Sequence, residues 1–188
     1  MGLPVNFRRA GLLEDSMGAA VLPKLGGGTA VLAGSCSAAT RRQVARMAAR
    51  CPSVRIDPQE LAAGEAVIEA VSRWAAGRIG DGPVLIYSTA EPEQVAAVQT
   101  RLGREAAGRL VEEAMAGLAR RLRQAGVRHF IVAGGETSGA VLAALKVRAL
   151  RIGPEIAPGV PCTVSEEEPH LCLALQSGNF GDDDFFEQ

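Results

Sequence analysis

The sequence carries almost no net charge, and this absence limits the partners it can attract. Its 188 residues include 20 Lys and Arg against 21 Asp and Glu, which gives a formal charge of −1 at pH 7. Without a strong field of one sign, nothing concentrates polyanions near the surface. We therefore expect neither nucleic acid nor an acidic membrane surface as a partner.

Long hydrophobic segments are missing as well. A membrane-spanning helix needs about 20 mostly apolar residues, and no stretch of this sequence approaches that length. Residues 1–18 lack the apolar centre of a secretory signal peptide. These two absences predict a soluble, cytoplasmic protein that does not enter the membrane.

Metal-site spacing is absent too. The 4 cysteines form no C-x-x-C pair, and the 2 histidines lie far apart in the sequence, so the usual ligand pattern of zinc is missing. Cys36 lies in a polar turn where a nucleophile could stand, but no nearby sequence feature offers it a base. We interpret all the cysteines as reduced thiols.

The pattern that is present is an alternation of short apolar runs with segments of helical period, and 47% of the residues are apolar. Strands are predicted at 29–34, 53–57, 83–88, 129–134, 147–153 and 171–176. Helices are predicted at 37–50, at 91–103, at 105–125, at 136–146 and from Pro58 onward with an interruption at Gly64. Residues 154–162 are interpreted as a proline-stiffened connection. This order predicts an α/β fold, with a mainly parallel sheet flanked by helices in three Rossmann-like layers.

Two of these helices have distinct end signals. In the helix at 91–103, Val95, Val98 and Leu102 share one face, and Gly103 is expected to end it. In the following helix, Gly126 can take the left-handed conformation that closes a helix. The sequence therefore predicts two successive helices separated by a glycine.

Three strands end in turns that combine glycine with hydroxyl or amide side chains. These turns read AGSCSAAT after the first strand, AGGETSG after the fourth and QSGNFG after the last. Ligands of open α/β sheets bind beyond the carboxyl ends of the strands, and glycine lets the backbone approach them closely. Two of the turns lead into helices, whose amino ends favour phosphate. We therefore predict one phosphate-binding site, with candidate residues Ser35, Ser37, Gly134, Gly135, Glu136, Thr137, Ser138, Gly178 and Asn179.

A structural role is open for several of these residues. Ser37 and Ser138 could be helix N-caps, and Gly134 and Gly135 could serve tight packing of a strand against a helix. Glu136 could face Mg²⁺ or position water, or it could be a first-turn acid favoured by the helix dipole. The sequence has no G-x-x-x-x-G-K-[ST] loop, and no catalytic residue can be named from it.

At these same turns the sequence resembles the C-terminal nucleotide-binding domain of the four-carbon acid sugar kinase family, which includes 3-oxo-tetronate, D-threonate and D-erythronate kinases. The matching motifs are LAGSCSAATRRQVA, VAGGETSGAVLAAL, RIGPEIAPGVP and SGNFGDDDFF, in that order between residues 32 and 186. The resemblance implies that residues 1–188 form a single nucleotide-binding domain for ATP or ADP and Mg²⁺. Residues 1–28 would be a linker or extension, because GLP at 2–4 resembles the beginning of the domain.

The resemblance also implies a reaction: transfer of the γ-phosphate of ATP to a hydroxyl of a C4 sugar acid. The N-terminal sugar-acid-binding domain would be absent here, so a missing domain or a separate chain would complete the enzyme, and this chain alone would be inactive. Two alternatives stay open, a non-catalytic module that senses a nucleotide or a phosphosugar, and a different α/β enzyme that acts on a phosphosugar. A homo-oligomer is also an open expectation.

Three positions depart from the family pattern. Gln176 stands where the family usually has Lys, Lys146 where it has Gly, and Cys162 where it has an aromatic residue. The change at position 176 removes a cation, which predicts weaker phosphate binding and a gain in ATP affinity for Gln176→Lys.

Overall fold

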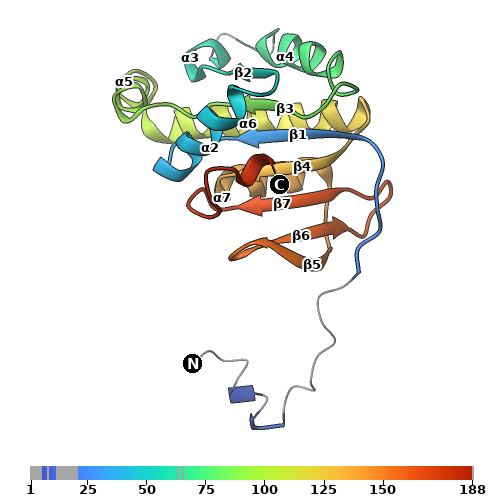
Figure 1. Cartoon of the computed structure of the whole chain (residues 1–188). Helices are drawn as coiled ribbons and strands as arrows, with labels where there is room; N and C mark the ends of the chain where they lie inside the picture. The colour runs from blue at the N-terminus through green and yellow to red at the C-terminus, as the bar shows by residue number, and fades with distance from the viewer. Residues whose placement is uncertain (1–5, 8, 12–20, 63, 65, 188) are drawn as a thin grey trace.

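A seven-stranded sheet forms the centre of the computed structural model, which describes residues 6–7, 9–11, 21–62, 64 and 66–187. Figure 1 shows its strands in the order β2-β3-β1-β4-β7-β6-β5. Their bounds are β1 (Gly28–Ala33), β2 (Ser53–Arg55), β3 (Val84–Tyr87), β4 (Val127–Ala133), β5 (Leu150–Ala157), β6 (Val160–Ser165) and β7 (Cys172–Gln176). The strands from β2 to β7 in this order pair in parallel, and β6 and β5 add an antiparallel edge.

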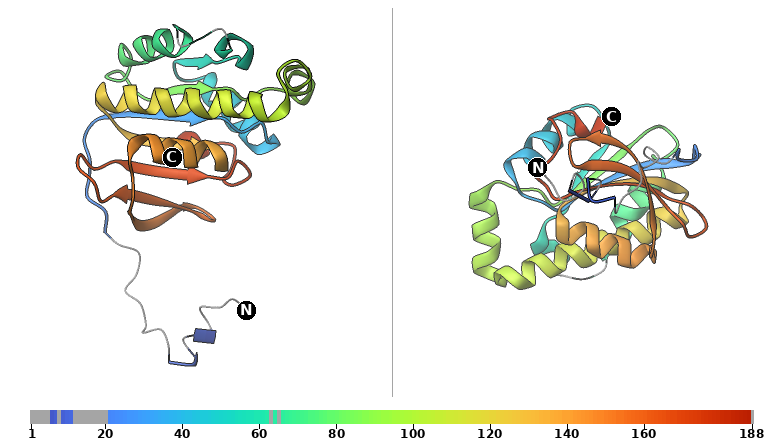
Figure 2. Two further views of the ribbon diagram at one scale, coloured as in Figure 1. Left: turned by 180° about the vertical axis from the view of Figure 1, so that it is seen from behind. Right: turned by 90° about the horizontal axis from the view of Figure 1, so that it is seen from below.

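Helices cover both faces of the sheet, as the two views in Figure 2 show. Their bounds are α2 (Ala38–Ala48), α3 (Pro58–Leu61), α4 (Ala66–Ala76), α5 (Pro92–Leu102), α6 (Arg104–Gln124), α7 (Gly135–Leu145) and the 3₁₀ turn η1 (Phe185–Glu187). Helices α3, α4, α6 and α7 contribute to the apolar cluster on one face, and α2 and η1 to the cluster on the other. The predicted three-layer α/β fold is confirmed.

Strand β1 shows why both faces must be covered. Its side chains alternate between the two clusters, with Ala30 and Leu32 in one and Val31 and Ala33 in the other. All four are fully buried. Because successive side chains of a strand point to opposite faces, an apolar run of this kind requires a helix layer on each side.

The predicted interruptions between helices are found at glycines. Gly64, with φ of 124°, lies between α3 and α4, and Gly103, with φ of 83°, is the single residue between α5 and α6. Residues other than glycine rarely adopt such φ angles. Glycine therefore allows the chain to change direction at these two positions. As a result α5 stands at an angle to α6 beyond the carboxyl edge of the sheet (Figure 2).

The interpretation of residues 154–162 as a connection was wrong. These residues belong to a hairpin in which β5 extends to Ala157, Gly159 with φ of 79° lies in the turn, and β6 begins at Val160. Pro154 is tolerated because β5 is the edge strand, and its pairing with β6 shifts register on both sides of Glu155. Pro158 lies in the turn, and Pro161 precedes Cys162, where β6 begins to pair with β7. The prolines therefore mark an edge hairpin.

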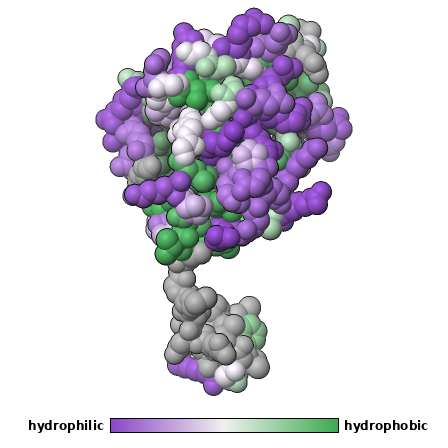
Figure 3. Space-filling view, turned by 90° about the vertical axis from the view of Figure 1, so that its right-hand side faces the viewer, coloured by the Kyte–Doolittle hydropathy of each residue, from purple (hydrophilic) through white to green (hydrophobic). Residues whose placement is uncertain are grey.

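The amino ends of the parallel strands present a mainly hydrophilic surface with a narrow apolar band (Figure 3). Within the described part of the chain, no helix has the length and apolar character that crossing a membrane requires. Residues 2–4, which carry the expected beginning of the domain, lie outside the described residues. Residues 21–27 form neither helix nor strand before β1 begins.

Candidate functional site

The three turns singled out in the sequence lie side by side, because β1, β4 and β7 are neighbours in the sheet. Backbone hydrogen bonds join them. The amides of Gly34 and Ser35 donate to the carbonyl of Ala133 at 3.0 and 3.1 Å, and the amide of Gly134 donates to the carbonyl of Gln176 at 2.9 Å. The chain leaves β1 through α2 toward β2 on one side of the sheet and leaves β4 through α7 toward β5 on the other. The carboxyl ends of these neighbouring strands therefore form the kind of switch point where open α/β sheets bind ligands.

Two glycines allow the first two turns to pack against α7. A Cβ on Gly34 would overlap the hydroxyl of Thr137, and a Cβ on Gly134 would lie 3.0 Å from the same oxygen and 3.3 Å from the amide nitrogen of Ser35. Thr137 is buried between them, with 5% of its surface exposed. These glycines and Thr137 therefore fix the position of α7 relative to β1.

Gly135 differs from these neighbours. It is the first residue of α7 and is exposed to solvent. A Cβ built on it would meet no described heavy atom within 4 Å. Packing therefore does not require glycine here. The first amides of a helix have no partner within the helix, so the space in front of Gly135 is suited to an anion.

Ser138 supplies a hydroxyl at the same helix end. Its side chain is 8% exposed, and its Oγ has no hydrogen-bond partner among the described residues. The N-cap of α7 is Gly134, which makes no side-chain cap, so the N-cap interpretation of Ser138 was wrong. A buried hydroxyl without a partner is costly, so this oxygen is a candidate to hydrogen-bond a ligand that the helix end admits.

Ser37, in contrast, has the structural role. It is the N-cap of α2: its hydroxyl accepts from the amide of Thr40 at 3.1 Å and donates to the carbonyl of Gly178. The Thr40 hydroxyl donates to that same carbonyl at 2.9 Å, and the Ser35 hydroxyl accepts from the Ser37 amide at 3.2 Å. Because a Cβ on Gly178 (φ 94°) would lie 2.9 Å from Cβ of Ser35, these residues join the β7 turn tightly to the β1 turn.

Asn179 is exposed at the tip of the β7 turn, whereas Gln176 lies beneath it. Gln176 is 2% exposed, and its Nε2 donates to Oε1 of Gln43 in α2 at 2.9 Å. Gln43 in turn donates to the carbonyl oxygens of residues 180–182 at 2.9 to 3.3 Å. The Gln176 side chain therefore supports the turn from inside, and in this conformation it does not face the open side where phosphates would lie.

A cavity of about 780 Å³ adjoins the first two turns. Its inner end is formed by residues 34–36 and by Glu136 and Thr137. The outer walls come from α5, the first turns of α6, the end of β3 and the segment from β2 to α3, with lining residues Arg55, Pro58, Ser88, Ala90, Gln94, Val95, Val98, Gln99, Arg104, Glu105, Ala107, Gly108, Arg109, Val111 and Glu112. Its volume lies in the range of small-molecule and cofactor sites.

These outer walls are not evident from the sequence alone. The residues after β3, Ser88 and Thr89, carry part of the signal of the other turns, because hydroxyl side chains follow a buried strand there without a glycine. The Thr89 hydroxyl donates to the carbonyl of Ser35 at 2.8 Å. The apolar face of α5 was visible as a pattern. Only the tertiary structure shows that this face borders a cavity.

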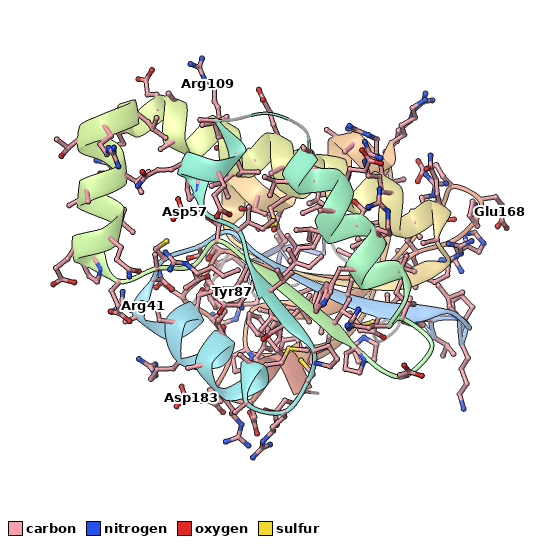
Figure 4. All side chains as sticks on the ribbon, turned by 90° about the horizontal axis from the view of Figure 1, so that it is seen from above. Arg41, Asp57, Tyr87, Arg109, Glu168 and Asp183 are labelled. Carbon is pink, nitrogen blue, oxygen red and sulfur yellow. The ribbon has the colours of Figure 1, made fainter. Side chains whose placement is uncertain are left out.

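Charged groups of both signs surround the cavity. Arg41 donates to the carbonyl of Cys36 at 2.9 Å and pairs with Glu91 at 3.2 Å. In Figure 4, Arg41 lies beside the space between α2 and α5, and Arg109 extends outward from α6. Among the described residues, no three His, Cys, Asp or Glu side chains are grouped to hold a metal ion. Three carboxylates line the cavity separately, Glu105 and Glu112 from α6 and Glu136 beside the β4 turn.

Comparisons with known proteins identify the family. The family described as "Nucleotide-binding C-terminal domain" matches residues 30–186. This chain belongs to that family. It is 59% identical to a 3-oxo-tetronate kinase of Pseudomonas fluorescens and 57% identical to one of Cupriavidus necator, and each match covers 100% of this chain and 43% of the relative. The resemblance found in the sequence is thereby confirmed.

Solved structures agree with this assignment. A Salmonella typhimurium protein described as a putative tRNA synthase matches with a TM-score of 0.82 and 40% identity over 87% of this chain and 40% of its own. A Haemophilus influenzae protein matches with a TM-score of 0.82 and 36% identity over 96% of this chain and 43% of its own. The chain therefore spans less than half the length of these relatives.

Proposed function

We propose that this domain binds ATP across the three turns and, with a sugar-acid-binding part, transfers the γ-phosphate to a hydroxyl of a C4 sugar acid. The 3-oxo-tetronate kinases named above support the reaction class. Since this chain matches less than half of each of them, we propose that the acceptor site and the base that activates its hydroxyl lie outside these 188 residues.

The observation that carries the proposal is the amino end of α7. It combines open space in front of Gly135 with a buried Ser138 hydroxyl that has no partner among the described residues. Backbone amides, a hydroxyl and the positive end of the helix dipole together suit a phosphate. The residues present therefore fit the triphosphate of ATP.

Phosphoryl transfer asks the protein mainly to position groups and to stabilise spreading charge. We propose that the turn at 134–138 orients the phosphates through its amides and through the Ser138 hydroxyl. Mg²⁺, when bound, neutralises phosphate charge. Because Mg²⁺ is often held by one carboxylate together with phosphate oxygens and waters, the carboxylate of Glu136, beside the turn proposed to hold the phosphates, would be enough to orient it.

A matched pair of glycine variants tests the site. Gly135 and Gly139 both lie on exposed positions of α7, and a Cβ on either meets no described heavy atom within 4 Å. Gly135→Val would intrude on a bound phosphate and lower ATP affinity at least tenfold, roughly 1.4 kcal/mol, in isothermal titration. Gly139→Val would leave the affinity unchanged. Equal affinities for the two variants would show that phosphate does not approach Gly135.

Ser138→Ala gives a second signature, in which stability and affinity change in opposite directions. Removing a buried hydroxyl that has no described partner should leave the free energy of unfolding unchanged or raise it. The same change should weaken ATP binding several-fold. A loss of stability with unchanged ATP affinity would assign Ser138 to packing.

Glu136→Gln should weaken ATP binding mainly when Mg²⁺ is present.

A ligand panel separates the kinase domain from the alternatives. ATP, ADP and sugar phosphates, each with and without Mg²⁺, are compared by thermal shift. Preference for adenine nucleotides supports the proposal, whereas preference for a sugar phosphate favours a phosphosugar enzyme or sensor. We further expect no phosphorylation of threonate, erythronate or 3-oxo-tetronate by this chain alone, and measurable activity by the isolated chain would contradict the proposed division of the sites.

A further inference from the structure

Helix α5 is attached to the rest of the molecule in an unusual way. Every residue of α5 is described, and none of them is buried. A helix in a packed α/β domain normally stabilises itself by burying one face, so α5 lacks the usual apolar anchorage. It joins α6 through Gly103 alone, and a Cβ there would meet no described heavy atom within 4 Å.

Polar side chains on the surface hold α5 to the body. Exposed contacts of this type each contribute about 0 to 1 kcal/mol, so they allow the helix to move at a small cost in free energy. Such contacts are Arg55 to Gln94 at 3.2 Å, Arg101 to Gln59 at 2.6 Å and Arg41 to Glu91 at 3.2 Å.

The inner face of α5 borders the cavity. Val95 and Val98, half-buried, line it together with the amide side chains of Gln94 and Gln99. The opposite end of the same cavity is formed by the turns proposed to hold the phosphates. A ligand with its phosphates at those turns would therefore extend its other end toward α5.

We propose that α5 is a movable wall that closes on the nucleoside part of the bound nucleotide, with Val95 and Val98 packing against the base. This inference rests on the proposed ATP site. The chemistry of the wall fits a base, because its two valines offer apolar contact and its two glutamines offer hydrogen-bond donors and acceptors at the edge. Rotation at Gly103 brings the helix inward.

Two isosteric substitutions on the inner face test the contact. In the double variant Val95→Thr and Val98→Thr, the shape is kept and each site gains a hydroxyl. Because neither valine is buried in the free protein, its melting temperature should change by no more than about 2 °C. ATP affinity should fall at least fivefold, whereas affinity for inorganic tripolyphosphate should not change. The matched control, Ala97→Thr, lies on an exposed position of the same helix and should not alter either affinity.

Hydrogen exchange measured by mass spectrometry tests the closure separately. ATP should slow exchange of the amides in 92–102, and tripolyphosphate should not. If ATP binds but the double variant and the exchange of α5 are unaffected, the inference is overturned and the proposed ATP site stands. If neither ATP nor tripolyphosphate binds the unmodified chain, the proposed function fails and the inference fails with it.

Discussion

Replacing Gly34 with alanine should disturb the junction between the β1 turn and α7. Gly34 has no left-handed φ, so alanine causes no backbone strain there. Its added Cβ would overlap the Thr137 hydroxyl and lie 3.3 Å from Thr137 Cβ and Cγ2. Thr137 is buried, so closely packed neighbours leave its side chain little room to rotate away.

The expected cost follows from overpacking. Inserting one methyl group into a packed site typically costs 1–3 kcal/mol, and we expect about 2 kcal/mol for Gly34→Ala. For a domain of this size that lowers the melting temperature by roughly 4–8 °C. Urea unfolding followed by circular dichroism measures the change directly.

A double-mutant cycle decides whether the cause is this contact. Thr137→Ala alone should cost about 1 kcal/mol, and the combined variant should also cost about 1 kcal/mol because the new methyl group then occupies the freed space. The coupling between the two sites is therefore about 2 kcal/mol. Gly108→Ala is a suitable control, since its Cβ would lie 3.7 Å from the nearest atom, Glu112 Oε1, and should stabilise α6. Additive costs at positions 34 and 137 would refute the reasoning.

Four further outcomes are expected. Lys146 ends α7 in the left-handed conformation, with φ of 59° and ψ of 33°, which glycine adopts more easily. Lys146→Gly should therefore raise the free energy of unfolding by about 1 kcal/mol, and an unchanged urea midpoint would contradict this. Cys36 lines the cavity, so ATP should slow its alkylation in peptide mass spectrometry. Burial, with a neighbouring thiol, raises the pKa of Cys172 to about 12, so at pH 8 this thiol should react slowly whether or not ATP is present. Gln43→Leu removes hydrogen bonds to residues 180–182 and should cost about 2 kcal/mol; full stability would mean that apolar contacts alone hold this segment.

Local periodicity was enough to predict most of the sheet and its helices. A buried strand such as β1 is apolar at successive positions because helices cover both faces of the sheet. The glycines at 64 and 103 mark the places where one helix ends and the next begins. The meeting of the three turns was also predictable. Strands of a parallel sheet place their carboxyl ends at one edge, so residues at 34–38, 134–138 and 176–180 gather there once the strands are neighbours.

Features that depend on what surrounds a segment were not predictable. Pro154 and Pro161 read as a connection, but Pro154 lies in the edge strand β5, and Pro161 precedes Cys162, where β6 begins to pair with β7. The apolar stripe of α5 was correctly located, yet only the tertiary structure shows that Val95 lines a cavity. Likewise, nothing local to Gln176 indicates that its amide turns toward Gln43 beneath the turn.

The edge strand β5 has a consequence for the behaviour of the protein at high concentration. An edge with a straight row of free amides and carbonyls invites intermolecular strand pairing and aggregation. Here Pro154 offers no amide, Arg151 and Glu155 place charges along the strand, and the pairing with β6 shifts register twice, which bends the edge. Two molecules that met edge to edge would find a poor template for a continuous sheet. We therefore expect the folded chain to resist strand-mediated polymerisation even in concentrated solution.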